Sequence, residues 1–450
     1  HFRRYEFMDV NKVQQSLKNT AQEAVEHARK LGVEQAEAGV SYDEGFSVTV
    51  RLGELESIER QRDRGLAVTV YTKGRKGSAS TTECSSVAVE ETVRKAISIA
   101  NFTSEDDYAG LAEPELMARE LPDLDLYHPW AIGIVEAEAL ALRAEAAALG
   151  MDDRIKNSEG ASVSTGKGVH VYANTHGFCE GYPTSSHSLS CGVIAEKDNS
   201  LERDYWVTVA RAYQELDEPE KVGEEAASRT LRRLGARQMS TCSVPVVFPA
   251  ELARGLFGHL VAAIKGTSQY RKASFLLDAK GEQIFSDFIG IEEDPFIPRA
   301  MGSTAFDNEG VATQHRHLVE KGVLNGYVLS SYSARRLGMQ TTGNSGGVHN
   351  LIVRSNAGSL DSLLKQCPEV FLVGELLGQG VNTVTGDYSR GAAGFWVEEG
   401  EIAYPVHEVT IAGNLREIFK GIRAVGSDVD LRGSIRCGSV LVEGLTVAGA

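Results

Sequence analysis

The spacing of hydrophobic residues changes near the start of the chain, and this change most limits the folds that the chain can adopt. Apolar side chains recur every three or four residues over residues 13–31, which predicts an amphipathic helix that ends at Gly32. They then alternate with polar residues around Val48 and Val68, as in half-exposed strands. A second helical spacing covers residues 87–100. Helix, antiparallel strands and helix in this order predict an α+β layer.

Glycines interrupt the alternating stretches. They stand at Gly45, Gly53, Gly65 and Gly74. Glycine adopts the backbone conformations of tight turns at little cost. We therefore expect all four to mark hairpin turns between short strands.

A second and a third unit follow. The stretch 106–129 has no clear period and contains three prolines, which predicts a linker. Helical patterns at 136–149 and 221–234 enclose strand-like pieces, so the second unit is also expected to be α+β. The third unit begins with a strand at 244–248 and a helix at 250–265, and then becomes rich in glycine and strand formers. Such a pattern predicts a rolled, barrel-like sheet.

These patterns predict an α+β protein in three parts. We expect an N-terminal α+β domain over residues 8–121, a central α+β domain over 127–235 and a β-rich, barrel-like C-terminal domain over 241–450. Residues 1–7 are expected to be an artificial remnant, with Met8 as the native start.

Composition argues against several classes of partner. The formal net charge is −16, from 62 acidic and 46 basic side chains. Nucleic acids and anionic membrane surfaces attract a positive footprint, so neither is expected to bind directly. No run of 18 apolar residues exists that could cross a bilayer. The six cysteines include no C-x-x-C pair, which favours reduced thiols and a cytoplasmic location.

Three short motifs could carry chemistry. Residues 343–347 fit G-x-S-x-G around Ser345, but a strand-like segment follows where a nucleophile elbow needs a helix. His315 and His317 would share one face of a strand and could bind a metal, although no third ligand is evident nearby. The pair at 407–408 lacks the second histidine of H-E-x-x-H. We expect a glycine loop, solvated histidines and a strand, respectively.

Residues 386–396 form the densest stretch of glycine and polar residues. The candidate positions on it are Asp387, Tyr388, Ser389 and Arg390. One interpretation is a surface that receives an extended substrate chain. The alternative is a turn closed by a local pair between Asp387 and Arg390.

The same stretch resembles the PmbA (TldE) branch of the TldD/PmbA family, formerly called "modulator of DNA gyrase". Further strings that resemble this family lie at residues 75–80, 255–260, 306–311, 331–338 and 410–415. The resemblance extends over nearly the whole chain from about Met8.

This resemblance implies a function. Its members pair as two paralogues that together form a cytosolic bacterial zinc metalloprotease, which processes a microcin precursor and degrades unfolded polypeptides. The TldD-type paralogue carries zinc on an H-E-x-x-x-H helix, with a cysteine from the C-terminal region as a further ligand. The other paralogue has a degenerate site.

At the positions that match the zinc motif, this sequence has Arg254, Gly255 and His259, with Cys437 where the cysteine is expected. Arginine is a permanent cation and glycine cannot act as a base. The resemblance therefore implies no catalytic residue and no metal in this chain, with zinc in the partner subunit.

Two other functions remain open. The chain could be an independent hydrolase that uses Ser345 or the pair His315 and His317. It could instead regulate DNA gyrase through protein contacts. The expected partners are a TldD-type paralogue in a heterodimer, peptide or unfolded polypeptide substrates and, when the chain is alone, a second copy.

Overall fold

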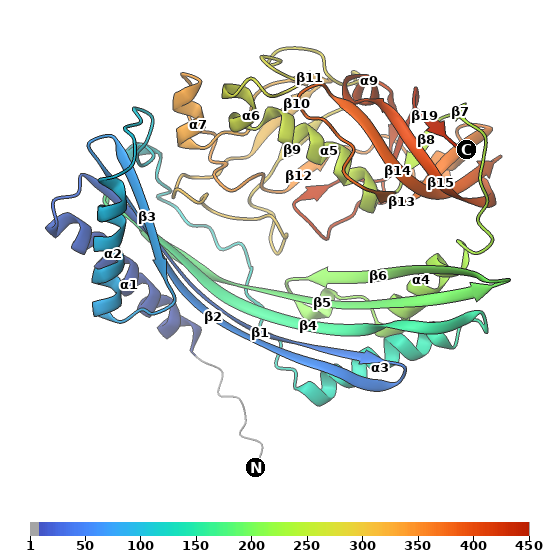
Figure 1. The fold of residues 1–450 in the computed structure, drawn as a ribbon, viewed down its shortest axis with the longest axis horizontal. Helices are drawn as coiled ribbons and strands as arrows, with labels where there is room; N and C mark the ends of the chain where they lie inside the picture. The colour runs from blue at the N-terminus through green and yellow to red at the C-terminus, as the bar shows by residue number, and fades with distance from the viewer. Residues whose placement is uncertain (1–8, 450) are drawn as a thin grey trace.

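The computed structural model describes residues 9–449. Its first half contains four α-helices, six strands and two short 3₁₀ helices (Figure 1). In chain order these are α1 (Val10–Lys30), β1 (Gln35–Arg51), β2 (Glu54–Thr72), β3 (Arg75–Thr81), α2 (Ser86–Ala100), η1 (Pro114–Leu116), α3 (Ile134–Leu149), β4 (Ile155–Asn174), β5 (Cys179–Lys197), β6 (Ser200–Ala210), η2 (Tyr213–Glu215) and α4 (Pro219–Leu231). The helices predicted near residues 13–31, 87–100, 136–149 and 221–234 are therefore present.

All six strands belong to one antiparallel sheet in the order β3-β2-β1-β4-β5-β6. Strand β1 joins the two α+β units, because it pairs with β4 from Glu37 opposite Asn174 to Val50 opposite Ala161. The α+β class with a barrel-like C-terminal part is confirmed, and the sequence did not predict this continuous sheet.

The expectation that four glycines mark hairpin turns is half wrong. Gly53 and Gly74 do lie in turns, with φ values of +80° and +69°. Gly45 and Gly65 lie inside β1 and β2 instead. At Gly45 a Cβ atom would meet the Thr165 carbonyl oxygen at 2.4 Å, so glycine serves the close approach of neighbouring strands there.

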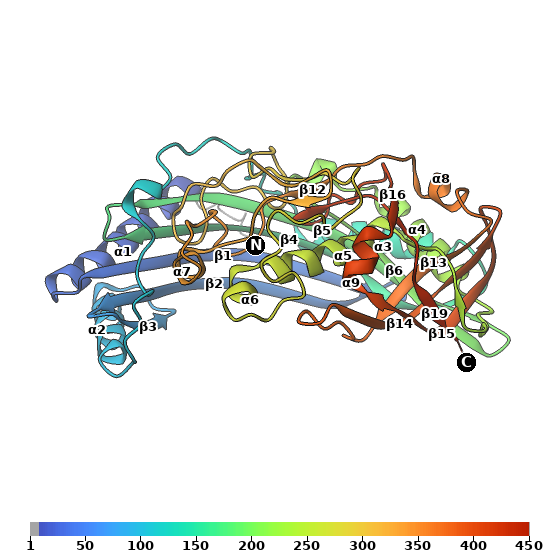
Figure 2. The same ribbon diagram turned by 90° about the horizontal axis from the view of Figure 1, so that it is seen from above.

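The two faces of this sheet differ in chemistry. One face carries buried apolar side chains such as Val48, Val68 and Val171, against which α1–α4 pack. The alternating positions on the opposite, concave face are small or polar, because neighbouring side chains in a strand point to opposite faces. The C-terminal part of the chain lies over this concave face (Figures 1 and 2).

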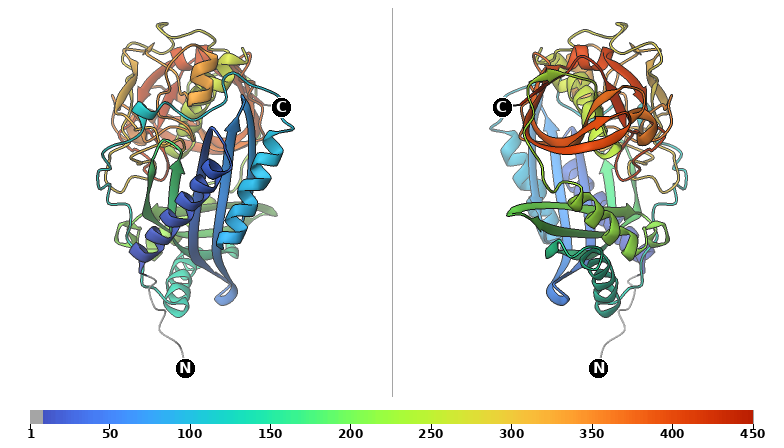
Figure 3. Two further views of the ribbon diagram at one scale, coloured as in Figure 1. Left: turned by 90° about the vertical axis from the view of Figure 1, so that its left-hand side faces the viewer. Right: turned by 90° about the vertical axis from the view of Figure 1, so that its right-hand side faces the viewer.

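The second half of the chain forms a β-rich domain around α5. Its elements are β7 (Cys242–Ser243), β8 (Val246–Phe248), α5 (Ala250–Ile264), α6 (Gly266–Tyr270), β9 (Ile291–Glu293), β10 (Arg316–Glu320), β11 (Val323–Leu324), α7 (Ser331–Arg336), β12 (Leu351–Val353), α8 (Leu360–Leu364), β13 (Glu369–Leu377), β14 (Asp387–Glu398), β15 (Glu401–Asn414), α9 (Leu415–Lys420), β16 (Ile422–Val425), β17 (Ile435–Arg436), β18 (Val440–Val442) and β19 (Thr446–Ala448). An eight-stranded sheet runs in the order β16-β18-β8-β13-β14-β15-β19-β7, beside a five-stranded sheet. Figure 3 shows the larger sheet curling around α5, whose Phe257 and Leu260 are fully buried.

The predicted linker packs against both halves of the molecule. Residues 106–129 include η1, and Met117 forms a β-bridge with Val311 of the C-terminal half. At the start of this segment the side chain of Arg335 on α7 donates hydrogen bonds to Glu113 and to the Gly110 carbonyl oxygen. This segment therefore anchors the C-terminal half at one end of the sheet.

An arginine cluster around Trp206 anchors the other end. The guanidinium groups of Arg229 and Arg432 lie 5.0 and 4.3 Å from the Trp206 ring centroid. Arg432 also bonds to buried Asp430 at 2.9 Å and to the Val207 carbonyl oxygen at 2.9 Å. Since Trp206 and Val207 belong to β6, these contacts join the sheet to the C-terminal half.

Within residues 9–449, none of the helices is both long enough and apolar enough to span a bilayer.

Replacing Arg432 should destabilise the protein. Arg432→Ala leaves the Asp430 carboxylate, which is 4% exposed, without its main cation. Breaking a buried ion pair in this way costs about 3 kcal/mol. Urea denaturation followed by tryptophan fluorescence should show this loss in the free energy of unfolding.

Arg203→Ala provides the matched control, because Arg203 pairs with Glu159 on the same sheet but is 73% exposed. Exposed ion pairs contribute little to stability, so this variant should unfold nearly as the wild type does. Equal effects of the two substitutions would show that the cluster does not hold the domains together.

Candidate functional site

Helix α5 carries the positions that resemble a zinc motif. Its buried face, including Ala253, Leu256 and Phe257, packs into the C-terminal core. The neighbouring positions around the helix lie outside this core. Gly255 is exposed, and a Cβ atom there would meet nothing within 4 Å. The motif positions at residues 254 and 255 therefore face away from the core.

Arg254 is linked to the arginine cluster around Trp206 through Asp430, a residue of its own C-terminal half. Its guanidinium lies 3.7 Å from the Asp430 carboxylate, which Arg432 also binds. These two cations hold the pKa of the Asp430 carboxyl below its usual value, although burial opposes them. The first motif position is thus a cation paired with a buried anion.

Cys437 is fully buried beside the first turn of α5. Its Sγ atom lies 4.0 Å from the Ala250 carbonyl oxygen. Burial, with the nearby Asp430 carboxylate, raises the pKa of the Cys437 thiol to about 12. The group is accordingly a neutral thiol at physiological pH, whereas metals bind the thiolate.

His259, further along α5, packs against β14. Its ring meets the Tyr388 ring edge-to-face with centroids 6.1 Å apart. Burial lowers the pKa of His259, and the Arg390 cation lowers it further. Burial also raises the pKa of Tyr388 to about 12. The imidazole and the phenol are therefore both neutral at pH 7.

The structure places one motif position, His259, beside one residue of the candidate substrate route, Tyr388. The other candidate residues do not share this contact. In β14, Tyr388 is buried and Arg390 is half-buried on the side of His259, while Asp387 and Ser389 are exposed. This split follows from the alternation of side chains along a strand.

The alternative of a local Asp387–Arg390 pair is wrong. Asp387 accepts a hydrogen bond from the Thr385 hydroxyl at 2.7 Å, and Arg390 donates to the Gly378 carbonyl oxygen at 2.9 Å. The role of the four residues in a substrate route stays a prediction.

The two histidines of the sequence motif do lie together. His315 and His317 have ring centroids 5.3 Å apart, and both approach the Glu292 carboxylate, at 3.3 and 3.8 Å. Arg354 lies 3.7 Å from the same carboxylate and competes with any bound cation. Within the described residues 9–449, no cluster of three or more His, Cys, Asp or Glu side chains is arranged to hold a metal ion.

The G-x-S-x-G segment forms a loop. Residues 343–347 are in neither helix nor strand, with a turn at 345–346, and β12 follows them in place of a helix. The backbone N–H of Ser345 donates to the Asp307 carboxylate at 2.9 Å. The strand–turn–helix geometry of a nucleophile elbow is therefore not formed.

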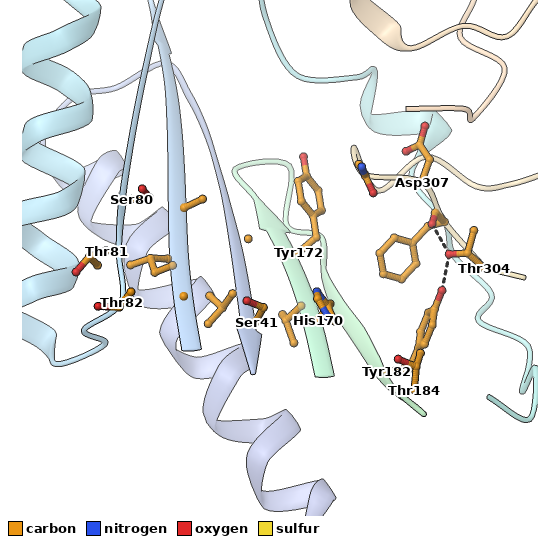
Figure 4. Close-up of a pocket in the computed structure, with 18 of the residues that line it drawn as sticks. Ser41, Ser80, Thr81, Thr82, His170, Tyr172, Tyr182, Thr184, Thr304 and Asp307 are labelled. Atoms are coloured by element: carbon orange, nitrogen blue, oxygen red, sulfur yellow. Dashed lines mark hydrogen bonds between the residues drawn. The ribbon is translucent and has the colours of Figure 1, made fainter. Parts of the chain in front are cut away.

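The sequence reasoning missed a cavity of about 970 Å³ on the concave face of the sheet. Strands β1–β5 line one side of it and the loop 303–308 lines the other, as Figure 4 shows. The only sequence signal is the run of Gly, Ser and Ala at the concave positions of β1 and β2.

Models of the first, central and C-terminal domains of the PmbA/TldA metallopeptidases match residues 36–100, 127–234 and 241–449. The chain belongs to the PmbA/TldD family of metallopeptidases.

Its relatives match over nearly their full length. The chain is 49% identical to the metalloprotease PmbA of Escherichia coli O157:H7, covering 95% of this chain and 96% of the relative. It is 46% identical to a PmbA homologue of Haemophilus influenzae, covering 97% of each.

Solved structures share the fold. A Bacteroides thetaiotaomicron protein, named as a candidate modulator of DNA gyrase, has a TM-score of 0.92 at 28% identity and covers 98% of this chain and 100% of its own. TldE from Thermococcus kodakarensis has a TM-score of 0.85 at 22% identity, covering 95% and 99%, which shows the fold alone.

The residues at the motif positions do not fit the zinc ion that the family implies. A catalytic zinc needs about three ligands around one point and an open position for water. Arg254 offers a cation, Gly255 no side chain and Cys437 a buried neutral thiol. His259 is then the one remaining ligand among these four positions, and its ring packs against Tyr388.

The titration of His259 tests this geometry. We expect the His259 imidazole to titrate below its ordinary pKa in the native protein, because burial and Arg390 disfavour its charged form. Arg390→Gln should raise this pKa towards the ordinary value without fully restoring it, since burial remains. NMR titration of the histidine side chains measures the shift, with His259→Gln to assign the signal. An unchanged pKa in Arg390→Gln would contradict the described arrangement.

Proposed function

We propose that this chain is the non-catalytic subunit of a two-component zinc metalloprotease of the TldD/TldE type. Its role is to bind and enclose peptide substrates, and the zinc belongs to a TldD-type paralogue with which it forms a heterodimer. Unfolded polypeptides and modified peptide precursors of the microcin kind are the substrates, and the complex works in the cytoplasm. The three proposed domains are residues 8–121, 127–235 and 241–450.

One observation supports the non-catalytic role above the others. Arg254 stands where a zinc-binding histidine is expected, and it is engaged by the buried Asp430 carboxylate. The same carboxylate also binds Arg432, which contacts β6. At this position the chain thus carries a cation that is paired with a buried carboxylate of the same C-terminal half, which supports the proposal that it holds no metal there.

The paralogous fold supports the partnership. A paralogue retains the shape of an interface, so two related chains can form a pseudo-symmetric dimer and enclose the active site of one of them. When the partner is absent, the same surface favours a homodimer.

Mixing the two subunits tests the proposal. We expect the pure chain to contain no stoichiometric zinc by mass spectrometry and to leave casein uncleaved. Cleavage should appear when the TldD-type paralogue from the same genome is added, and should exceed the activity of that paralogue alone. One zinc per chain together with cleavage by the pure chain would overturn the proposal.

Variants of the rival sites separate this proposal from an independent hydrolase. Ser345→Ala and the double variant His315→Ala, His317→Ala should leave the activity of the mixture within about twofold of wild type, because neither place has a complete catalytic geometry. A loss of a hundredfold or more in either variant, with unchanged thermal stability, would favour a hydrolase site in this chain.

A further inference from the structure

The residues that line the cavity on the concave face come from five neighbouring strands, so the cavity extends across the strands as a trough. Its floor consists of residues that lie opposite one another in neighbouring strands. In one row Ser80 faces Ala67, Ala67 faces Gly39, and Gly39 faces Tyr172. In the next row Gly65 faces Ser41, Ser41 faces His170, and His170 faces Tyr182. Both rows have small side chains on β1–β3 and large rings on β4 or β5.

The low floor is built by residues with little or no side chain. A Cβ atom at Gly39 would meet nothing within 4 Å, and one at Gly65 would meet only the Ser41 hydroxyl, at 3.6 Å. Neither glycine has a positive φ. These two positions therefore leave open space above the sheet. Because their backbone conformation does not require glycine, a larger residue could be accommodated there.

The wall of the trough is held by contacts between the two halves of the chain. The Tyr182 hydroxyl hydrogen-bonds with Thr304 and accepts the Ala305 N–H, and the Tyr182 ring lies 5.7 Å from the Phe306 ring (Figure 4). Asp307 accepts the backbone N–H groups of Glu309, Val311 and Ser345. The loop 303–308 is thus fixed by its own hydrogen bonds and by the sheet.

The polar groups in the trough suit an uncharged ligand. The hydroxyls of Ser41, Ser80 and Thr184 have no hydrogen-bond partner within the described part of the chain, and they can bond to a ligand. The charged groups are already engaged: His170 pairs with Asp43 at 3.1 Å, and both oxygens of Asp307 accept backbone N–H groups. A free charge on the ligand would find no partner of opposite sign that is not already bound.

The length of the trough fits a short extended peptide. It is lined by five adjacent strands, β3 to β5 across β2, β1 and β4. With strands about 4.8 Å apart, this spans about 19 Å. An extended chain advances about 3.3 Å per residue, so roughly six residues cover that distance.

We propose that this trough binds an extended, uncharged segment of the polypeptide substrate. The inference rests on the proposed function for the class of ligand, and on the trough for its place and chemistry. Hydroxyls on the floor bond to the peptide backbone, while Tyr172, Tyr182 and Phe306 contact its side chains. Backbone recognition of this kind tolerates many sequences, as a protease subunit acting on unfolded chains requires.

Filling the floor tests the inference directly. Gly39→Leu and, separately, Ala67→Leu place a branched side chain in the trough, and both positions accept it because their backbone is extended. The probe is a fluorescein-labelled decapeptide of Gly, Ala, Ser and Asn, and its binding to the full chain is measured by fluorescence anisotropy. We expect both variants to weaken binding at least tenfold.

Ser188→Leu is the matched control. Ser188 lies on the same concave face, in β5, but outside the trough. This variant should bind the probe as wild type does, with the same thermal stability. A second probe with Asp at alternate positions should bind at least tenfold more weakly to wild type.

The outcomes separate this inference from the proposed function. The trough proposal would be overturned if the wild type did not bind the probe, or if Gly39→Leu and the wild type bound it equally. This holds even if the mixture with the paralogue cleaves casein. A loss of probe binding in Gly39→Leu and Ala67→Leu, but not in Ser188→Leu, would support the trough proposal. The mixing experiment does not depend on these variants, so failure of cleavage counts against the subunit role alone.

Discussion

The structure depends on the alternation of side chains along six strands that share one sheet. Because β1 pairs with β2 on one side and β4 on the other, its apolar positions join those of both neighbours in a single surface. Four helices cover that surface, and burial of its apolar side chains supplies the main stabilisation of this half. The same alternation sends glycine and hydroxyl side chains to the concave face, where they form the floor of the cavity. The buried apolar face and the candidate binding surface thus both follow from the alternation of side chains along the strands.

The C-terminal half is held over this face at both ends. Arg335 binds the segment before η1 at one end, and Arg432 binds Asp430 and β6 at the other. Arg254 lies beside the second contact, where the buried Asp430 carboxylate neutralises its charge. Within this contact Arg432 is the residue that joins the two halves, because it binds both Asp430 and the Val207 carbonyl oxygen of β6.

Much of the local structure was predictable, because helix and strand periods depend on neighbours in sequence. Helix α5 lies at Ala250–Ile264, as its pattern predicts, and α1 ends just before Gly32. Gly45 was misread because nothing in the local sequence shows that Thr165, far along the chain, approaches it in the sheet. The candidate site was predictable only in part. Residues 387–390 were treated as one surface, whereas strand alternation places Tyr388 against His259 and leaves Asp387 exposed.

The sequence by itself determined the α+β class, the barrel-like C-terminal part, the family resemblance and the residues at the motif positions. Each of these depends on residue type and on spacing over a few turns or strands. Only the tertiary structure decided that the first two units share a sheet, that Arg254 pairs with Asp430 and that Cys437 is buried. It also decided that loop 303–308 closes a cavity over Gly39 and Ser41. These features join residues that lie far apart in the chain, and such contacts arise from the packing of whole elements, which no local pattern records.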